Sequence, residues 1–399
     1  MITKELLELI HEAASMQRWN DHIRPHNGFT ELDKQAHKMV FAYVLARFEE
    51  SDHGLEIDWC HLIEGGLFEM LHRILLTDIK PPVFHRLMAK KGEQLNRWVI
   101  EKLEERNIFA LEGGFKERFT RYFFDPSYCA LEKKILRASH YLATDWEFKI
   151  IYPFCKGFYG VEETKQRIAN EIEDHYDLAG VQKISLGLKT ANFLDLIGQL
   201  RFQERWSQTP RIPRTSVLGH MLVVAIMSYL VSYETGACRK RLYNNYFAGL
   251  FHDLPEVLTR DIVSPVKSAI DELDSIIKEI ENSQIEEKIF PLLPEGWHSE
   301  IEYFTQDEFS NKIIIDGKVN SFGKENIPDE FNNDIYSPLD GQIIRGCDKL
   351  AVFLEAYLSV RYGIDTHVLR EGYNNTFKLY KDSIICGYNF GKLFNYFRL

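Results

Sequence analysis

The amino-acid sequence predicts an all-α protein made of two tandem helical bundles. Its 399 residues exceed one ordinary domain and leave each of two domains enough length for its own core. The residues best suited to chemistry lie in apolar runs typical of buried helices, and the first half of the chain is a diverged repeat of the second. We therefore expect an N-terminal bundle over residues 1–160, a helical connection over 161–195 and a C-terminal bundle over 196–399.

Composition and charge exclude several classes of protein. Hydrophobic residues make up 45 % of the chain without any run of eighteen apolar residues, so no membrane span is expected. The net charge of −11 argues against a general nucleic-acid surface, because a polyanion is repelled by an acidic protein face. The six cysteines have no C-x-x-C spacing, and the N-terminus predicts an amphipathic helix and not a signal peptide. We expect reduced thiols and a cytoplasmic location.

The repeat appears when the first half is compared with the second at a shift of 183 residues. This shift places His37 on His220 and residues 66–83 on 249–266, where nine of eighteen positions are identical. The pair Arg18-Trp19 likewise precedes His37, as Arg205-Trp206 precedes His220. A longer shift pairs residues 136–143 with 344–351. The two halves are therefore predicted to share one architecture.

The halves differ in the residues that could bind a metal. Where the second half has His252, Asp253, Glu256 and Asp348, the first half has Glu69, Met70, Arg73 and His140. A thioether does not replace a carboxylate on a hard ion, and an arginine adds a fixed positive charge where a proton-transfer group would stand. We expect the first half to bind no metal and to act as a packing or regulatory copy. The alternative is a softer ion held by His37, Glu69, His72 and His140.

In the second half, the candidate ligands lie in three apolar stretches. His220 lies within residues 217–225, His252 is followed directly by Asp253, and Asp348 lies within residues 345–354. Two imidazoles and two carboxylates on packed helices would neutralise their buried charge by holding a divalent cation. Glu256 follows on the same predicted helix, three residues after Asp253, where it could move a proton without being a ligand. The alternative for His252 is a buried histidine bonded to its own helix.

The remaining stretches predict peripheral elements. Residues 268–288 have the spacing of an amphipathic surface helix. Residues 306–341 are polar, and Lys312–Ile315 predicts a short strand in a small insertion that could cover the pocket. The tail over residues 373–399 is rich in Phe and Tyr, which predicts that it docks on a core.

The order His220, His252-Asp253, Asp348 resembles the signature of the HD phosphohydrolase superfamily. Residues 252–267 resemble more narrowly a segment of bacterial HD-type 5′-deoxynucleotidases, which also carry an Arg-Trp pair before the first histidine. The resemblance covers residues 196–365 and implies an all-helical bundle around one or two divalent cations. Residues 1–160 would then be a degenerate HD-like domain. Known relatives are single-copy homodimers, so the N-terminal copy is expected to stand in for a second subunit as a pseudo-dimer, with further homo-oligomerisation possible.

The resemblance also implies a role for each site residue. The metal ligands are His220, His252, Asp253 and Asp348, and the catalytic groups are Glu256 and Asp253. The substrate residues are Arg205 for the phosphate, Trp206 against a 2′-hydroxyl, Asp261 for the 3′-hydroxyl and Lys267 for added positive charge near the phosphate. Core packing for Trp206 and surface charge for Lys267 are the alternatives. Gly219 and Arg260 depart from the family pattern around the substrate, not around the metal.

These observations predict a metal-dependent phosphohydrolase that removes phosphate from (deoxy)nucleoside 5′-monophosphates. The cation could be Mn, Co, Mg, Ni, Fe or Zn, and the partner is a small-molecule nucleotide. One alternative is an HD phosphodiesterase or nucleoside triphosphate hydrolase. The other is a non-catalytic, nucleotide-sensing regulatory protein, against which Glu256 argues because binding alone needs no proton-transfer group.

Overall fold

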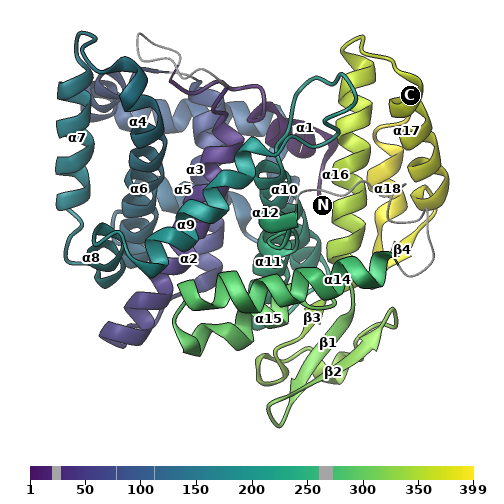
Figure 1. Ribbon diagram of the computed structural model, residues 1–399. Coiled ribbons are helices and arrows are strands. Elements are labelled where there is room, and N and C mark those ends of the chain that lie inside the picture. Colours follow the sequence, from purple (N-terminus) through teal and green to yellow (C-terminus); the bar gives the residue numbers. More distant parts are fainter. Residues whose placement is uncertain (20–27, 78, 112, 260–272) are drawn as a thin grey trace. The chain divides into compact units, whose positions relative to one another are not determined.

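A computed structural model describes residues 1–19, 28–77, 79–111, 113–259 and 273–399 (Figure 1). The chain divides into two compact units, Met1–Leu188 and Lys189–Leu399. Nearly all regular structure in both units is helical, and the strands are few and short. The predicted all-α fold class is thus confirmed.

The first unit is a helical bundle around one long helix, α2. Its helices are α1 (Lys4–Glu12), α2 (Glu31–His53), α3 (Trp59–Leu76), α4 (Pro81–Glu105), α5 (Phe115–Phe124), α6 (Ala130–Cys155), α7 (Val161–Glu173) and α8 (Ala179–Ser185). Helix α2 packs against α3, α6 and α8. It begins where the Thr30 side chain accepts a hydrogen bond from the Asp33 amide, and it ends at Gly54, which has the left-handed conformation that glycine adopts easily.

The second unit is built around the apolar helix α10. Its helices are α9 (Lys189–Gly198), α10 (Val217–Glu234), α11 (Arg239–Phe251), α12 (Glu256–Thr259), α14 (Leu273–Gln284), α15 (His298–Thr305), α16 (Gly341–Arg361), α17 (His367–Tyr380) and α18 (Phe390–Asn395). Within the described residues, α10 alone is long and apolar enough to cross a membrane, but 89 % of it is buried inside the unit. It is therefore the core helix on which α11 and α16 pack.

A glycine sets the close approach of α11 to α10. A Cβ atom added at Gly249 would lie 2.9 Å from the Cα atom of Ala225, which is backbone and cannot move aside. Glycine therefore lets the two helices pack more closely than any larger residue would. This contact lies one turn before His252 and brings the end of α11 towards α10.

A small three-stranded sheet precedes α16. Strands β1 (Asn311–Ile315) and β2 (Lys318–Gly323) form an antiparallel hairpin, and β3 (Leu339–Asp340) pairs with the other edge of β1. The buried Asp340 accepts hydrogen bonds from the Arg241 guanidinium at 2.5 and 2.6 Å and so ties the sheet to α11. Because β3 leads directly into α16, this ion pair also fixes the start of the helix that carries Asp348. The predicted strand in a small insertion is confirmed.

The structure also describes most of the predicted amphipathic helix over residues 268–288 and the aromatic tail over residues 373–399. Helix α14 exposes Ile276 and Ile280 and buries Ile277, as an amphipathic helix does, while residues 268–272 of the predicted helix lie outside the described residues. The aromatic tail buries Phe390, Phe394 and Phe397, which confirms its predicted docking. Tyr388–Asn389 (β5) pairs with Ile384–Ile385 (β4) just before α18.

Candidate functional site

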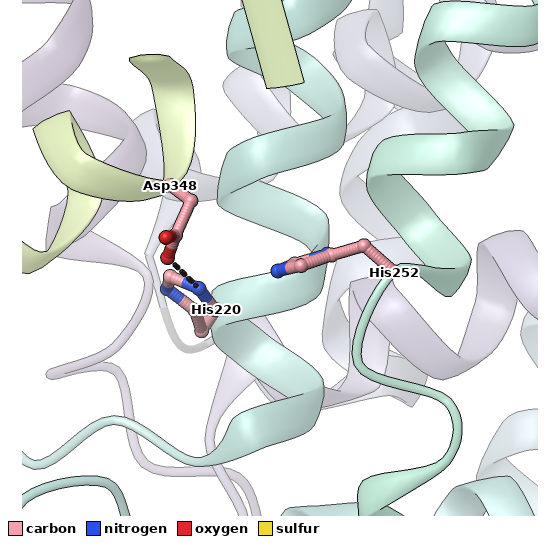
Figure 2. Close-up of side chains that lie close together, drawn as sticks. All are labelled: His220, His252 and Asp348. Carbon is pink, nitrogen blue, oxygen red and sulfur yellow. Dashed lines mark hydrogen bonds and ion pairs between the residues drawn. The ribbon is translucent and has the colours of Figure 1, made fainter. Parts of the chain in front are cut away.

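Three buried side chains from three separate elements meet at one point of the second unit. They are His220 on α10, His252 at the end of α11 and Asp348 on α16, and their ligand atoms all lie within 4.8 Å of one another. Figure 2 shows the two imidazoles and the carboxylate turned towards a common space. His220 Nε2 and Asp348 Oδ1 are 3.1 Å apart. The three predicted ligands therefore come together as the sequence indicated.

Asp253 adds a second carboxylate to this group. Its Oδ2 atom lies 3.2 Å from His252 Nε2 and 3.8 Å from His220 Nε2. Donor atoms that share one ion at about 2.0–2.2 Å lie about 3.0–3.5 Å from one another at the angles of tetrahedral or octahedral coordination. Asp253 is thus near enough to both histidines to share an ion with them, although the atoms that all lie within 4.8 Å of one another belong to the other three residues.

The hydrogen bonding of His252 leaves one ring nitrogen suited to a cation. Its Nδ1 lies 2.8 Å from the Gly249 carbonyl oxygen, which can only accept, so Nδ1 carries the proton and Nε2 has a lone pair. In the described part of the chain, the buried Nε2 atom makes no hydrogen bond of good geometry, and its polar neighbour is Asp253 Oδ2 at 3.2 Å. A buried acceptor of this kind fits a metal ion.

The charges around the ligands also favour a cation. Burial opposes the ionisation of Asp253, but His252, His220 and Arg205 outweigh it, so the pKa of this carboxyl is lowered. Burial likewise opposes the ionisation of Asp348, whose pKa is nevertheless held well below its usual range by Lys349 and His220. Burial lowers the pKa of His220. Burial opposes the protonation of His252, but Asp253 outweighs it and raises the pKa of this imidazole. Two ionised carboxylates beside the neutral His220 imidazole give the group an anionic character that favours a cation.

The backbone around Glu256 differs from the prediction. A single helix carrying His252, Asp253 and Glu256 is wrong, because α11 ends at Phe251 and α12 begins only at Glu256. Pro255 explains the break, since its ring and missing N–H are incompatible with a helix interior. The intervening turn keeps the groups together, because the Glu256 amide donates to the Asp253 carbonyl at 3.1 Å. Glu256 is buried and lines the same cavity as Asp253.

The predicted pair Arg205 and Trp206 also reaches the site. Arg205 Nη1 lies 3.6 Å from Asp253 Oδ2, and the indole Nε1 of Trp206 donates to Glu355 Oε2 at 2.9 Å. Trp206 has a φ of 57°, a left-handed conformation that is uncommon for a bulky residue and is often found at functional sites. Its ring lies against α17, where a Cβ added at Gly372 would be 3.0 Å from Trp206 Cη2.

Glu355 is a site residue that the sequence analysis missed. It lies on α16, seven residues after Asp348, and is 2 % exposed. Burial opposes its ionisation, but Arg211 and Arg205 lower its pKa to about 2. A signal was present in the sequence, because extending the match of residues 136–143 with 344–351 by four positions places Glu147 on Glu355.

A cavity of about 870 Å³ opens beside the ligands, within the size range of small-molecule sites. Its lining includes His252, Asp253, Glu256, Asp348, Arg205, Trp206, Arg345, Lys349 and, on α17, Val368, Gly372, Asn375 and Thr376. Residues 305–309, between α15 and β1, also line it, whereas the strands of the sheet do not. Asp261 and Lys267, two predicted substrate residues, lie outside the described residues.

The first unit does not gather its histidines into a comparable group. Of the residues described, only those of the second unit bring three potential ligands close enough to hold an ion. His72 Nε2 lies 2.9 Å from Asn96 Oδ1, and the His37 ring packs against Phe41 and Trp146. In the described residues, the side chains of the alternative set His37, Glu69, His72 and His140 thus have other partners, and a softer ion among them stays a prediction.

Comparison with known proteins agrees with this site. A model of the HD domain family matches residues 197–377. A 5′-deoxynucleotidase of Pasteurella multocida is 25 % identical over 131 residues, 31 % of this chain and 65 % of that protein. A 5′-deoxynucleotidase of Vibrio atlanticus is 25 % identical over 128 residues, 31 % of this chain and 66 % of that protein. The chain thus aligns with slightly less than two thirds of these relatives, and no solved structure matches it.

The matched segment contains all four predicted ligands and the cavity beside them. Residues 197–377 of the second unit therefore match an HD domain, the domain type that the resemblance to the HD phosphohydrolase superfamily implies.

Proposed function

We propose that the second unit is a metal-dependent phosphohydrolase that releases phosphate from nucleoside 5′-monophosphates, deoxy forms included. The observation that carries this proposal is the buried group of His220, His252 and Asp348, which adjoins a cavity lined by Asp253, Glu256 and Arg205. The similarity to 5′-deoxynucleotidases supports the choice of substrate class.

His220, His252, Asp253 and Asp348 would hold the ion. A divalent cation supplies a Lewis acid for the phosphoryl oxygens and lowers the pKa of water. Two imidazole nitrogens and two carboxylate oxygens suit Mn, Co, Ni, Fe or Zn better than Mg, which prefers oxygen ligands throughout. Lys349 Nζ, 2.9 Å from Asp348 Oδ2, holds that carboxylate in place and adds positive charge at the cavity wall.

Glu256 is the proton-transfer group in this proposal. It is 8 % exposed and lines the cavity beside Asp253, so its carboxylate is shielded from bulk water yet faces the substrate space. A carboxylate in such a position can take a proton from the attacking water or give one to the departing 5′ oxygen. Asp253, which would bind the ion, also faces Arg205 and so orients the guanidinium towards the reacting phosphate.

Arg205 binds the phosphate and Trp206 shapes the sugar pocket. The Arg205 side chain lies at ion-pair distances of 3.6 and 3.7 Å from two carboxylates, so it retains hydrogen-bond donors for a phosphate. Trp206 presents a ring between the ligand group and α17. Asp261 is proposed to contact the 3′-hydroxyl and Lys267 to add positive charge. We also propose a cytoplasmic location.

A second candidate function is hydrolysis of nucleoside triphosphates or phosphodiesters. The cavity lining contains Arg345 and Lys349 on α16 in addition to Arg205, which is more positive charge than one phosphate requires. Purified protein incubated with Mn²⁺ and a panel of mono-, tri- and cyclic nucleotides separates the candidates by product. Inorganic phosphate from monophosphates supports the first. Pyrophosphate or triphosphate from a nucleoside triphosphate, or a nucleoside monophosphate from a cyclic nucleotide, supports the second. Ligand binding without turnover would indicate a sensor.

Metal binding is expected to stabilise the second unit. An ion that binds only the folded state at 100 times its dissociation constant adds about 2.7 kcal/mol to the free energy of unfolding. For a unit of this size, that energy raises the unfolding midpoint by about 5–10 °C. Differential scanning calorimetry with Mn²⁺ and with EDTA measures the shift. The shift should vanish in His252→Ala, and an equal shift in that variant would place the ion elsewhere.

A further inference from the structure

We propose that Glu355 is a positioning residue that sets the Arg205–Trp206 pair for the phosphate-bearing substrate. This inference rests on the proposed function, because it concerns how the same site binds phosphate. Glu355 does not line the cavity, whereas both residues of the pair do. It therefore acts through them and not on the substrate.

Both oxygens of the Glu355 carboxylate are used by the segment that precedes α10. Trp206 Nε1 donates to Oε2 at 2.9 Å, and the Thr215 hydroxyl donates to Oε1 at 2.5 Å. Arg205 Nε lies 3.7 Å from Oε2, and Arg211 Nη1 lies 3.9 Å from Oε1. One buried anion thus fixes the two ends of this segment and one edge of the Arg205 guanidinium.

The first unit contains the same arrangement. Arg18 Nε and Trp19 Nε1 both donate to Glu147 Oε2, at 2.9 and 2.8 Å. Trp19 has a φ of 55°, nearly the value of Trp206. We call the Arg-Trp pair with its glutamate the clamp, and it occurs once in each unit.

The two clamps differ in what else the arginine contacts. Arg18 Nη1 donates to Glu31 Oε2 at 2.9 Å, so carboxylates hold the guanidinium on two edges. Glu31 is the residue after the helix cap Thr30, and the residue after the corresponding cap Ser216 is the apolar Val217. Among described residues, the Arg205 side chain makes no hydrogen bond. Glu355 therefore lies at an ion-pair distance from Nε on one edge of the Arg205 guanidinium. The other edge faces Asp253 at 3.6 Å without a hydrogen bond and so keeps its N–H donors available for a phosphate.

The test replaces Glu355 with glutamine, which keeps the shape but removes the charge. We expect the KM for a deoxynucleoside monophosphate and the dissociation constant for inorganic phosphate to rise about tenfold, as loss of a charge-assisted contact would cause. Affinity for Mn²⁺ is expected to stay within about twofold and kcat within about threefold, because ligands and Glu256 are untouched. Steady-state kinetics and calorimetric titration with phosphate and with Mn²⁺ give these values.

Glu147→Gln is the matched control, because it makes the same change in the clamp of the first unit. It should leave KM and phosphate affinity at wild-type values. A Glu355→Gln variant that loses thermal stability while keeping wild-type KM and phosphate affinity would overturn the positioning role. Should that variant not fold, Thr215→Val removes one anchor only and is expected to raise both constants about threefold. Phosphate titration is independent of turnover, so a protein that hydrolyses nothing would contradict the proposed function alone.

A second inference rests on Lys34 and Lys38, two buried lysines of α2. We infer that the Lys34 amine stands in the place of the first metal ligand in the first unit, and that this unit is complete without a divalent ion. Lys34 Nζ forms a hydrogen bond with His140 Nδ1, as His220 Nε2 does with Asp348 Oδ1 in the second unit. The two pairs connect equivalent helices, α2 with α6 and α10 with α16.

The helix caps give the correspondence between the units. Lys34 is the fourth residue after the cap Thr30, and His220 is the fourth after the cap Ser216. Each cap forms a β-bridge with the residue before its Arg-Trp pair, Gln17 or Glu204. His140 precedes the clamp residue Glu147 by seven positions, as Asp348 precedes Glu355.

A close contact between helices gives the same register. Gly66 on α3 faces Met39, and Gly249 on α11 faces Ala225. Met39 and Ala225 are each the ninth residue after their helix cap. The pairing of His37 with His220 in the sequence comparison is therefore off by three residues, and Lys34 is the true counterpart.

The second ligand position of the first unit is also neutralised by an amine. The sequence repeat places Glu69 on His252. Glu69 Oε2 accepts a hydrogen bond from Lys38 Nζ, and Glu69 Oε1 accepts one from the Tyr122 hydroxyl at 2.7 Å. Burial opposes the ionisation of Glu69, but Lys38 lowers its pKa, so the pair is ionic. In the first unit, lysine amines therefore contact both His140 and Glu69, the residues that correspond to Asp348 and His252.

The metal content of the purified protein tests this inference without any substrate. The double variant His252→Ala, Asp253→Ala is equilibrated with Mn²⁺ or Zn²⁺, desalted and analysed by inductively coupled plasma mass spectrometry beside the wild-type protein. We expect the wild-type protein to retain metal and the double variant to retain none. An ion that persists in the double variant and disappears when His140→Ala is added would overturn the inference. Lys34→Ala in the otherwise wild-type chain should leave the metal content unchanged.

Discussion

Replacing Asp253 with alanine is expected to lower kcat/KM for phosphate release by about a thousandfold or more, as loss of a metal site does. Asp253 Oδ2 lies 3.2 Å from His252 Nε2 and 3.6 Å from Arg205 Nη1. The change therefore removes a proposed metal ligand and the carboxylate beside the arginine that is proposed to bind phosphate. Rates of phosphate release with saturating Mn²⁺ measure the effect. Added metal should not restore the rate.

The control for Asp253→Ala is Asp365→Ala. Asp365 is an exposed carboxylate of the same unit that pairs with Arg370 at 2.7 Å, remote in its contacts from the ligand group. We expect this variant to keep the wild-type rate. An Asp253→Ala variant within tenfold of wild type would show that the ion, or the reaction, lies elsewhere.

Replacing Glu256 with glutamine is expected to lower kcat by about 10²–10⁴-fold, the usual contribution of a positioned general acid or base. The amide keeps the size of the side chain but cannot accept and return a proton. Because Glu256 lines the cavity and is proposed as a proton-transfer group, not as a ligand, metal affinity should remain near the wild-type value. Kinetics and calorimetric titration with Mn²⁺ are measured on the same preparation.

Two results would contradict this role of Glu256. Loss of both activity and Mn²⁺ binding would make it a ligand, and full activity would leave proton transfer to another group. The backbone carbonyl of Glu256 accepts a hydrogen bond from Gln203 at 3.0 Å, which the substitution leaves in place. A change in kcat without a change in thermal midpoint therefore reports chemistry and not local unfolding.

The fold and the grouping of His220, His252 and Asp348 could be predicted from the sequence for physical reasons. Helical periodicity is a local property, and the apolar runs around His220 and Asp348 leave a buried polar residue only a structural or a metal-binding role. The helix break before Glu256 was also readable, since Pro255 excludes a helix interior. The prediction weighed spacing alone and so extended the helix too far.

Contacts between distant parts of the chain could not be read in the same way. Glu355 is separated from Trp206 by 149 positions and from Thr215 by 140, so nothing in its neighbourhood identifies the clamp. The sequence comparison pairs His220 with His37 and not with Lys34, the counterpart we infer, because few residues are identical around α2 and a three-residue slip moves one helix face onto another. The correspondence of Lys34 with His220 is inferred from the helix caps and from the glycine contacts between helices.

Some predictions remain untested by the described residues. Asp261 and Lys267 lie in the segment 260–272, and their substrate roles stay predictions. The pairing of the two units as a pseudo-dimer, any further oligomer and the cytoplasmic location also stay predictions.

Every role proposed for the second unit depends on a divalent ion that binds among His220, His252, Asp253 and Asp348. Crystals grown with Mn²⁺ and measured at the manganese absorption edge test it directly. We expect anomalous density within about 2.0–2.3 Å of His220 Nε2 and His252 Nε2 and of the two carboxylates. We expect none beside Lys34 and His140 in the first unit. A peak in the first unit, or an empty space between the two histidines at saturating Mn²⁺, would contradict it.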